Sequence, residues 1–144
     1  MNYFEEFSGI IKNCKTHFSK CPCCQHRKVR IFMLPGEFKN SNKNKNHIVI
    51  TNENYFGGKT GTCTKLCDEK DFKPFECKSY PYDPFFDEKG NLILKKSESC
   101  PLSKIELKDH KLKVFNMWKE LSKDVQIKNW IENVQFEGYT YIDE

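Results

Sequence analysis

The stretch Cys21-Pro22-Cys23-Cys24 places three thiols within four residues, and cysteines indicate a chemistry more directly than any other feature of this sequence. Cys14 lies a short distance upstream of this stretch. The remaining thiols are spread along a later part of the chain, at Cys63, Cys67, Cys77 and Cys100. Two stretches that are distant in the sequence can therefore close around shared sites. Thiols in this layout favour metal binding over catalysis as the first hypothesis.

The length of 144 residues predicts a single domain, residues 1–144, with a modest hydrophobic core. Residues 1–12 include two early acids and no continuous apolar stretch, so we expect neither a signal peptide nor a membrane anchor. No later stretch approaches the ~18 apolar residues of a membrane span. We therefore expect a cytoplasmic protein whose clustered thiols bind metal. A disulfide-stapled domain is the alternative, and the adjacent Cys23 and Cys24 argue against it.

The charge distribution argues against a nucleic-acid partner. The net charge is +4, but the lysines are interspersed with 20 acidic residues, and the two arginines are Arg27 and Arg30. A phosphate-binding face usually gathers arginines, which grip phosphate with two hydrogen bonds. The sequence also contains no phosphate loop, dinucleotide fingerprint or nucleophile elbow. It therefore assigns no catalytic activity, although Glu37 and Asp68 are candidate general bases near the cysteines.

The first half of the chain predicts a helix and two strands. Apolar residues recur at helical spacing over 3–18, and the apolar run 29–34 predicts a strand that ends at Pro35-Gly36. The polar run 39–47 predicts a connecting loop. The β-branched run 47–51 predicts a second strand, and we expect it to pair with the strand at 29–34.

Glycines and prolines mark the middle of the chain. The glycines ahead of Cys63 predict a turn-rich approach to a metal-bound sulfur, at Gly57, Gly58 and Gly61. Residues 68–101 contain four prolines and no sustained periodicity, which predicts an irregular segment held in place by a metal site. Within it, residues 87–91 predict a turn and residues 91–94 a short strand.

The last third of the chain predicts helices. Ser103 and Glu106 match the capping-box pattern of a helix start. Apolar residues then recur at helical spacing in two sets: Val114, Trp118, Leu121 and Val125, followed by Ile127, Trp130, Ile131 and Val134. We expect the tryptophans among them to pack in the core rather than bind a ligand. These sets predict one long helix or two short ones, and in the second case Asp124 would cap the second helix. We expect residues 103–136 to cover the cysteine-rich region 14–102. The predicted class is α+β, a small irregular cysteine-rich metal-binding domain with a few short strands and C-terminal helices.

The cysteine spacings suit zinc and an iron–sulfur cluster alike. Cys21-x2-Cys24 and Cys63-x3-Cys67 together provide the four thiolates of a Zn²⁺ tetrahedron, and a 4Fe–4S cluster also takes four thiolates. The thiols left for a second site, for structural roles or for exchange with the first set are Cys14, Cys23, Cys77 and Cys100. The spacing does not divide the eight thiols between sites. The best ligand candidates are Cys21, Cys23 or Cys24, Cys63, Cys67 and Cys77, and Cys14 and Cys100 are weaker ones.

Four histidines accompany the thiols. His17 and His26 each lie within three residues of a cysteine and are candidate ligands. Because eight thiols leave no need for a histidine ligand, we expect His47 and His110 at the surface.

Several motifs occur in an order that resembles a known family. The motifs are Cys21-Pro22-Cys23-Cys24, Leu34-Pro35-Gly36-Glu37-Phe38, Gly61-Thr62-Cys63-Thr64-Lys65-Leu66-Cys67 and Pro74-Phe75-Glu76-Cys77-Lys78-Ser79-Tyr80-Pro81, with a later Cys100. Over residues 14–102 this order is similar to the bacterial CxxCxxCC family of zinc- or iron-chelating proteins (YkgJ-like). The most specific elements are Pro-x-x-Cys-x-x-Tyr-Pro and the Gly-x-Cys before it. The resemblance implies a cysteine-rich domain that binds zinc or an iron–sulfur cluster.

The chain departs from the family pattern at two points. The family's first element is C-x2-C-x2-C-C, whereas this chain has C-x6-C-x-C-C, so the family's leading ligands do not transfer to Cys14 and Cys21. Lys73 stands where the family has arginine. Related sequence occurs in flagellin lysine N-methylases, which implies a cluster as readily as zinc. Three functions remain open: a cluster protein for electron transfer or metal handling, a structural-zinc module that binds a protein or nucleic acid, and a cluster-assisted protein-modifying enzyme.

Overall fold

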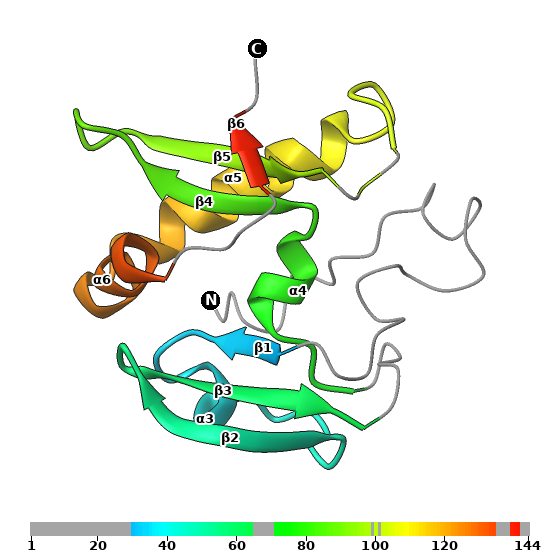
Figure 1. Ribbon diagram of the computed structural model, residues 1–144, viewed down its shortest axis with the longest axis vertical. Coiled ribbons are helices and arrows are strands. Elements are labelled where there is room, and N and C mark those ends of the chain that lie inside the picture. Colours follow the sequence, from blue (N-terminus) through cyan, green and yellow to red (C-terminus); the bar gives the residue numbers. More distant parts are fainter. Residues whose placement is uncertain (1–29, 65–70, 99, 101, 135–138, 142–144) are drawn as a thin grey trace.

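The computed structural model describes residues 30–64, 71–98, 100, 102–134 and 139–141. These residues form two small antiparallel sheets and four helices, which confirms the α+β class. The sheets lie at opposite ends of the molecule in Figure 1, and a short helix, α4, runs between them. The helix predicted over 3–18 lies outside the described residues.

The first sheet has β3 (Gly58–Cys63) between β1 (Arg30–Met33) and β2 (Ile48–Tyr55). The strand predicted at 29–34 is confirmed, but its predicted pairing with 47–51 is wrong. Both strands instead pair with β3, in antiparallel registers. The glycine-containing segment ahead of the cysteine is therefore the central strand of the sheet.

Close backbone packing explains why β3 contains glycines. A Cβ atom on Gly58 would lie 2.0 Å from the carbonyl oxygen of Met33, and one on Gly61 would lie 2.6 Å from a β2 carbonyl oxygen. The hairpin between β2 and β3 turns at Phe56 and Gly57, whose φ angles are 52° and 89°. Two successive positive φ angles are typical of a type I′ turn. The turn predicted at Gly57 is thus confirmed, whereas Gly58 and Gly61 lie in a strand.

The second sheet contains β4 (Tyr82–Phe86), β5 (Leu92–Ser97) and β6 (Tyr139–Tyr141), in the order β4-β5-β6. The prediction of an irregular segment is therefore wrong for a large part of 68–101, because α4 (Phe75–Ser79), β4 and β5 lie within it. The aromatic residues of this segment suit a half-buried strand in spite of its prolines.

The turn and strand predicted at 87–91 and 91–94 are confirmed. The Asp87 side chain accepts hydrogen bonds from the amides of Lys89 and Asn91, at 2.9 and 2.8 Å. These bonds close the turn between β4 and β5, as aspartate commonly does by bonding to its own backbone neighbours.

Helices α5 (Lys108–Leu121) and α6 (Val125–Asn133) show that the second of the two predicted alternatives, two short helices, is the one that forms. In the turn before α5, the Ser103 amide donates to the Glu106 carboxylate at 3.0 Å, and the Glu106 amide donates to the Ser103 hydroxyl at 3.1 Å. This is the reciprocal bonding that the capping-box pattern predicts, but it closes a turn, and the predicted helix start is too early because α5 begins at Lys108. Asp124 caps α6 as predicted, because its side chain accepts hydrogen bonds from the amides of residues 126 and 127.

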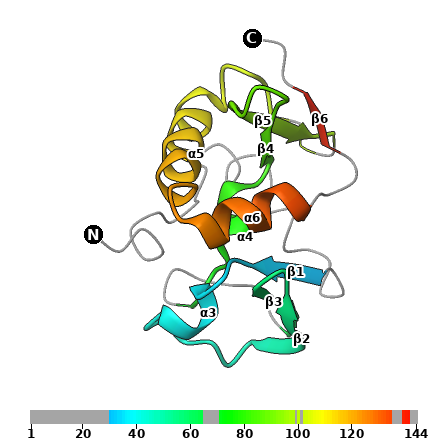
Figure 2. The same cartoon turned by 90° about the vertical axis from the view of Figure 1, so that its left-hand side faces the viewer.

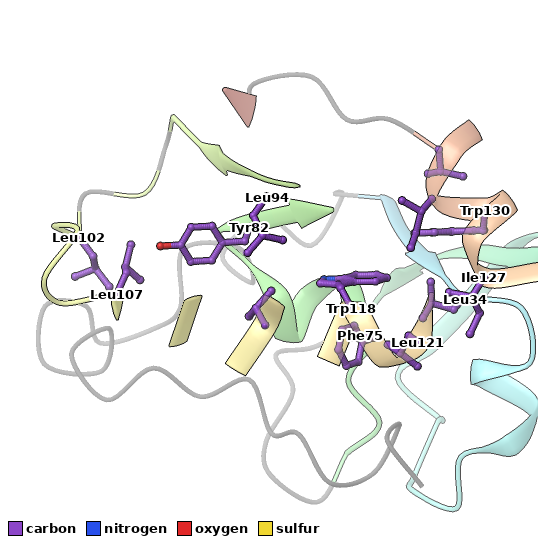
Figure 3. Packing of buried hydrophobic residues seen from close by; sticks show 13 residues of the cluster. Leu34, Phe75, Tyr82, Leu94, Leu102, Leu107, Trp118, Leu121, Ile127 and Trp130 are labelled. Atoms are coloured by element: carbon purple, nitrogen blue, oxygen red, sulfur yellow. The ribbon is translucent and has the colours of Figure 1, made fainter. Parts of the chain in front are cut away.

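The main cluster is the larger of two groups of buried apolar side chains in the described residues. It joins α5 and α6 to the second sheet and to α4 (Figure 3), and its members are Leu34, Phe75, Tyr82, Leu94, Leu102, Leu107, Val114, Trp118, Leu121, Ile127, Trp130, Ile131 and Val134. Trp118 stacks on Trp130 with ring centroids 6.3 Å apart and meets Phe75 edge to face at 4.8 Å. The predicted core roles of both tryptophans are confirmed. Val125 is not in the core: it is 82% exposed, as the first residue of α6.

The small cluster lies on the first sheet and consists of Ile31, Met33, Ile48 and Phe72. Helix α3 (Glu37–Asn40) follows β1 and occupies the start of the predicted loop 39–47. Figure 2 shows α3 and the first sheet at one end of the molecule, with α6 between them and the second sheet. Among the helices of the described residues, none is both long and apolar enough to cross a membrane.

Candidate metal centre

Two of the predicted ligands, Cys63 and Cys77, pack against the small cluster. Cys63 is the last residue of β3 and pairs with Ile48 of β2. Cys77 is the middle residue of α4, which contacts β1 on one side and β4 on the other. Both cysteines are half-buried. The fold therefore brings two thiols from separate elements to one apolar cluster.

Cys100 has different surroundings. It is half-buried and packs against the main cluster. Burial raises the pKa of Tyr82 to about 12, and the charge of the nearby Cys100 thiolate adds to the same shift. Cys100 is thus a neighbour of Tyr82 and of the second sheet, whereas Cys63 and Cys77 belong to the small cluster.

The other predicted ligands lie outside the described residues: Cys14, Cys21, Cys23, Cys24, Cys67, His17 and His26. The candidate base Asp68 lies there as well. In the ranges that the structure describes, no group of three or more His, Cys, Asp or Glu side chains is arranged to hold a metal ion. A complete ligand set therefore needs thiols in addition to Cys63 and Cys77.

Two carboxylates hold α4 in place beside the first sheet. The Glu76 carboxylate accepts a hydrogen bond from the Phe32 amide at 3.0 Å, on the edge of β1 that faces away from β3. The buried Glu37 carboxylate accepts one hydrogen bond from the Leu34 amide at 3.0 Å and another from the Phe75 amide. Glu37 is therefore a structural carboxylate and not a general base, because amide hydrogens engage both of its oxygens.

The carboxylates around α4 are electrostatically unusual. Although part of Glu76 is exposed, its carboxyl group is enclosed, and burial raises its pKa to about 8. The charges of Asp83 and Glu37 add to this shift, and the Phe32 amide opposes it. Burial also raises the pKa of Asp83 to about 8, against the attraction of Lys95. One Asp83 oxygen has no hydrogen-bond partner in the described part of the chain, which is consistent with a carboxyl group that stays protonated.

The prediction that His47 and His110 lie at the surface is wrong, because both side chains are buried. His47 Nε2 lies 2.8 Å from the Phe72 carbonyl oxygen, and His110 Nε2 lies 3.0 Å from the Tyr80 carbonyl oxygen. Burial lowers the pKa of His110, although hydrogen bonds to backbone carbonyls oppose the shift. A signal for His110 was present in the sequence, since it lies four residues before Val114 and shares its helix face. The polar run around His47 carries no such signal.

Comparison with known proteins identifies no relatives: no protein-family model, no curated protein and no solved structure matches this chain. The resemblance to the CxxCxxCC family therefore stays a prediction from the motifs. The placement of the thiols and of the groups that surround them is the structural basis for a functional proposal.

Proposed function

We propose that this chain is a cysteine-rich metal-binding protein that holds an iron–sulfur cluster through thiolates and serves in electron transfer or metal handling. The observation that supports this proposal best is the placement of Cys63 and Cys77 on one small apolar cluster. The remaining thiolates would come from residues 21–24 and from Cys67. Cys100 packs against the main cluster and is left out of the proposed site.

The chemistry of the donors fits such a group. Thiolates are soft ligands, which favour iron–sulfur clusters and zinc over cations that prefer oxygen. Cys63 and Cys77 are half-buried beside aliphatic and aromatic side chains, which exclude water from one side of the site. When bound, a 4Fe–4S cluster would supply one-electron chemistry. The residues of the chain would bind the cluster, shield it from water and set the electrostatic field around it.

The proposal also names a compartment and a partner. Thiolates stay available for metal in the reducing cytoplasm, so we place the protein there. An electron-transfer or metal-handling role requires a protein partner that exchanges electrons or metal with it. The dispersed lysines give no support to a nucleic-acid partner.

Structural zinc is the second candidate, in a module that binds a protein or nucleic acid. The observation that favours it is the small size of the apolar core on the first sheet, which consists of four buried residues in the described part of the chain. A closed four-thiolate zinc site adds folding free energy where apolar burial is limited. The spacing of Cys21, Cys24, Cys63 and Cys67 suits such a site.

Metal analysis after anaerobic purification tests the proposal. For an iron–sulfur cluster we expect iron, acid-labile sulfide and a broad absorption band near ~400 nm. A colourless protein with stoichiometric zinc would replace the cluster with the second candidate. A protein that binds neither iron nor zinc, even after reconstitution, would overturn both.

Serine variants locate the site. Cys63→Ser and Cys77→Ser should each lower the metal content by roughly tenfold or more, because each removes a thiolate ligand. Cys100→Ser is the matched control, since it makes the same change at a half-buried cysteine of the main cluster and should keep the metal. Full metal content in both test variants would place the site elsewhere.

A further inference from the structure

A short segment, Asn44–His47, holds two parts of the chain next to the candidate thiols. We call it the clamp segment. On one side, the His47 carbonyl oxygen accepts hydrogen bonds from the Thr64 amide at 2.8 Å and from the Thr64 hydroxyl at 3.3 Å. Thr64 directly follows Cys63. The clamp segment therefore fixes the end of β3 at the residue after the cysteine.

On its other side, the clamp segment holds the chain that leads to α4. The Phe72 amide donates to the Asn44 carbonyl oxygen at 2.8 Å, and the Asn44 side-chain amide donates to the Asp71 carboxylate at 3.2 Å. His47 Nε2 bonds to the Phe72 carbonyl oxygen at 2.8 Å. Phe72 is buried in the small cluster, and α4 with Cys77 begins three residues later.

His47 is the residue that takes part on both sides. Its backbone oxygen binds the segment after Cys63, and its side chain binds the segment before Cys77. A carbonyl oxygen can only accept a hydrogen bond, so His47 Nε2 carries the hydrogen in this contact. The side chain is 2% exposed, and a buried hydrogen bond of this kind is shielded from competition with water.

We propose that His47 is a positioning residue of the thiolate site, which sets the placement of Cys63 relative to Cys77. This inference rests on the proposed function in one respect, namely that the two thiols bind the same metal centre. Partners that orient metal ligands commonly change metal affinity by about 10- to 100-fold when they are removed. His47 acts on both thiols through the backbone, whereas a structural residue elsewhere in the core would not act on their relative placement.

Two substitutions at position 47 separate the side-chain bond from the volume of the residue. In His47→Gln, the terminal amide nitrogen of glutamine can take the place of Nε2 and donate to the Phe72 carbonyl oxygen. In His47→Leu, no donor remains and the carbonyl loses this bond. Val114→Ala is the control for a general loss of stability, because Val114 is fully buried in the main cluster on α5.

The first measurement is the affinity of the metal-free protein for Zn²⁺ under anaerobic conditions. We expect His47→Leu to bind Zn²⁺ about 10- to 100-fold more weakly, and His47→Gln to stay within about threefold of wild type. Val114→Ala should bind with wild-type affinity while it is folded. Wild-type affinity in His47→Leu would overturn the inference. So would an equal loss in His47→Gln and His47→Leu, because a positioning role needs only the Nε2 donor.

The second measurement needs no metal. In metal-free protein, alkylation by iodoacetamide followed by mass spectrometry gives separate rates for Cys63, Cys77 and Cys100. We expect His47→Leu to raise the rates of Cys63 and Cys77 relative to Cys100, and His47→Gln to leave the ratio unchanged. An unchanged ratio in His47→Leu would contradict the positioning role. This measurement still decides the inference if the wild-type protein binds no metal, in which case the proposed function fails by itself.

If His47→Leu does not fold, Asn44→Ala provides the same test in a milder form. Asn44 is exposed, and the substitution removes its side-chain bonds to Asp71 and to the Asn46 amide, while the backbone bond to Phe72 remains possible. We expect a smaller change in the same direction in both measurements. No change in either one would overturn the role of the clamp segment.

Discussion

Around the second sheet, 13 buried apolar side chains form the main cluster, whereas the small cluster of the first sheet contains four among the described residues. Around the first sheet, buried polar side chains that hydrogen-bond to the backbone supplement the few apolar contacts. Glu37 and Glu76 bind amides of β1 and its neighbours, and His47 binds the Phe72 carbonyl. The half around the second sheet therefore depends mainly on apolar burial, whereas the half around the first sheet depends more on a few specific hydrogen bonds. The proposed metal ligands Cys63 and Cys77 lie in the half around the first sheet.

The largest loss of stability should come from a substitution at the centre of the main cluster. Trp118→Ala removes a fully buried side chain that contacts Trp130 and Phe75, and we expect a loss of about 3–5 kcal/mol in the free energy of unfolding. Urea unfolding measures this loss. Leu112→Ala on the same helix is the control, because Leu112 is 61% exposed and its removal should change stability by less than about 0.5 kcal/mol. Equal effects of the two substitutions would contradict the assignment of the core.

A second substitution tests the buried hydrogen bonds around the first sheet. Glu37→Ala should cost about 2–4 kcal/mol, because the amides of Leu34 and Phe75 lose their buried acceptor. Hydrogen exchange should become faster in β1 and α4 and change little in β4 and β5. Glu53→Ala is the control, since Glu53 is exposed on the same sheet and pairs with Lys59. Uniformly faster exchange in both sheets would show that the two halves do not differ as described.

The carboxyl group of Asp83 should make stability depend on pH. Its folded-state pKa of about 8 lies above the ordinary value of 3.8, so the folded protein binds this proton more tightly than the unfolded chain does. The resulting stability is complete below pH 3.8, falls as the pH rises toward 8 and is lost above that. Asp83→Asn cannot ionise and should flatten this fall, with a higher melting temperature than wild type at alkaline pH.

Thermal unfolding at several pH values checks this prediction for Asp83. Asp109→Asn, at an exposed position on α5, should keep the pH dependence of the wild type. The Asp83 variant retains Glu76, whose pKa is also raised to about 8, so some pH dependence should remain. Identical pH profiles for wild type and Asp83→Asn would sink the idea that this carboxyl is protonated in the folded protein.

The smallest loss of stability should come from the N-terminal cap of α6. Asp124→Ala removes the acceptor for two amides at the start of α6 and should cost about 1 kcal/mol. Asp124→Ser should restore most of this loss, because serine also caps helices well. Urea unfolding of the three proteins measures the difference. A loss as large as that of Trp118→Ala would mean that α6 depends on its cap more than on the main cluster.

The sequence predicted best the features that depend on neighbouring residues. The capping box of Ser103 and Glu106, the Asp124 cap and the turn at 87–91 all involve hydrogen bonds between groups less than five residues apart. The residue types that form such bonds recur at fixed spacings, so the pattern is visible before folding. The core roles of Trp118 and Trp130 followed for the same reason, from helical periodicity.

The errors arose where distant segments meet. Gly58 and Gly61 suggested a turn, but they lie in a central strand because the backbones of β1 and β2 approach too closely for a Cβ atom. The prolines and aromatic residues of 68–101 suggested irregular chain, yet α4 and the paired strands β4 and β5 make a large part of it regular. The histidine in the polar run was expected in water, but Phe72 supplies it with a buried acceptor. In each case the deciding partner lies in another segment of the fold, 25 residues away for His47 and in the neighbouring strand for β4 and β5.

The sequence by itself determined the number and spacing of the thiols, the helical character of the C-terminal region and the Asp124 cap, because these are set by residue types within a few positions of one another. The tertiary structure alone decided that Cys63 and Cys77 share the small cluster while Cys100 packs against the main cluster. It also decided that buried carboxylates and His47 bind the backbone around the first sheet. The physical reason is that strand pairing and burial join groups tens of residues apart, for which the sequence has no fixed spacing.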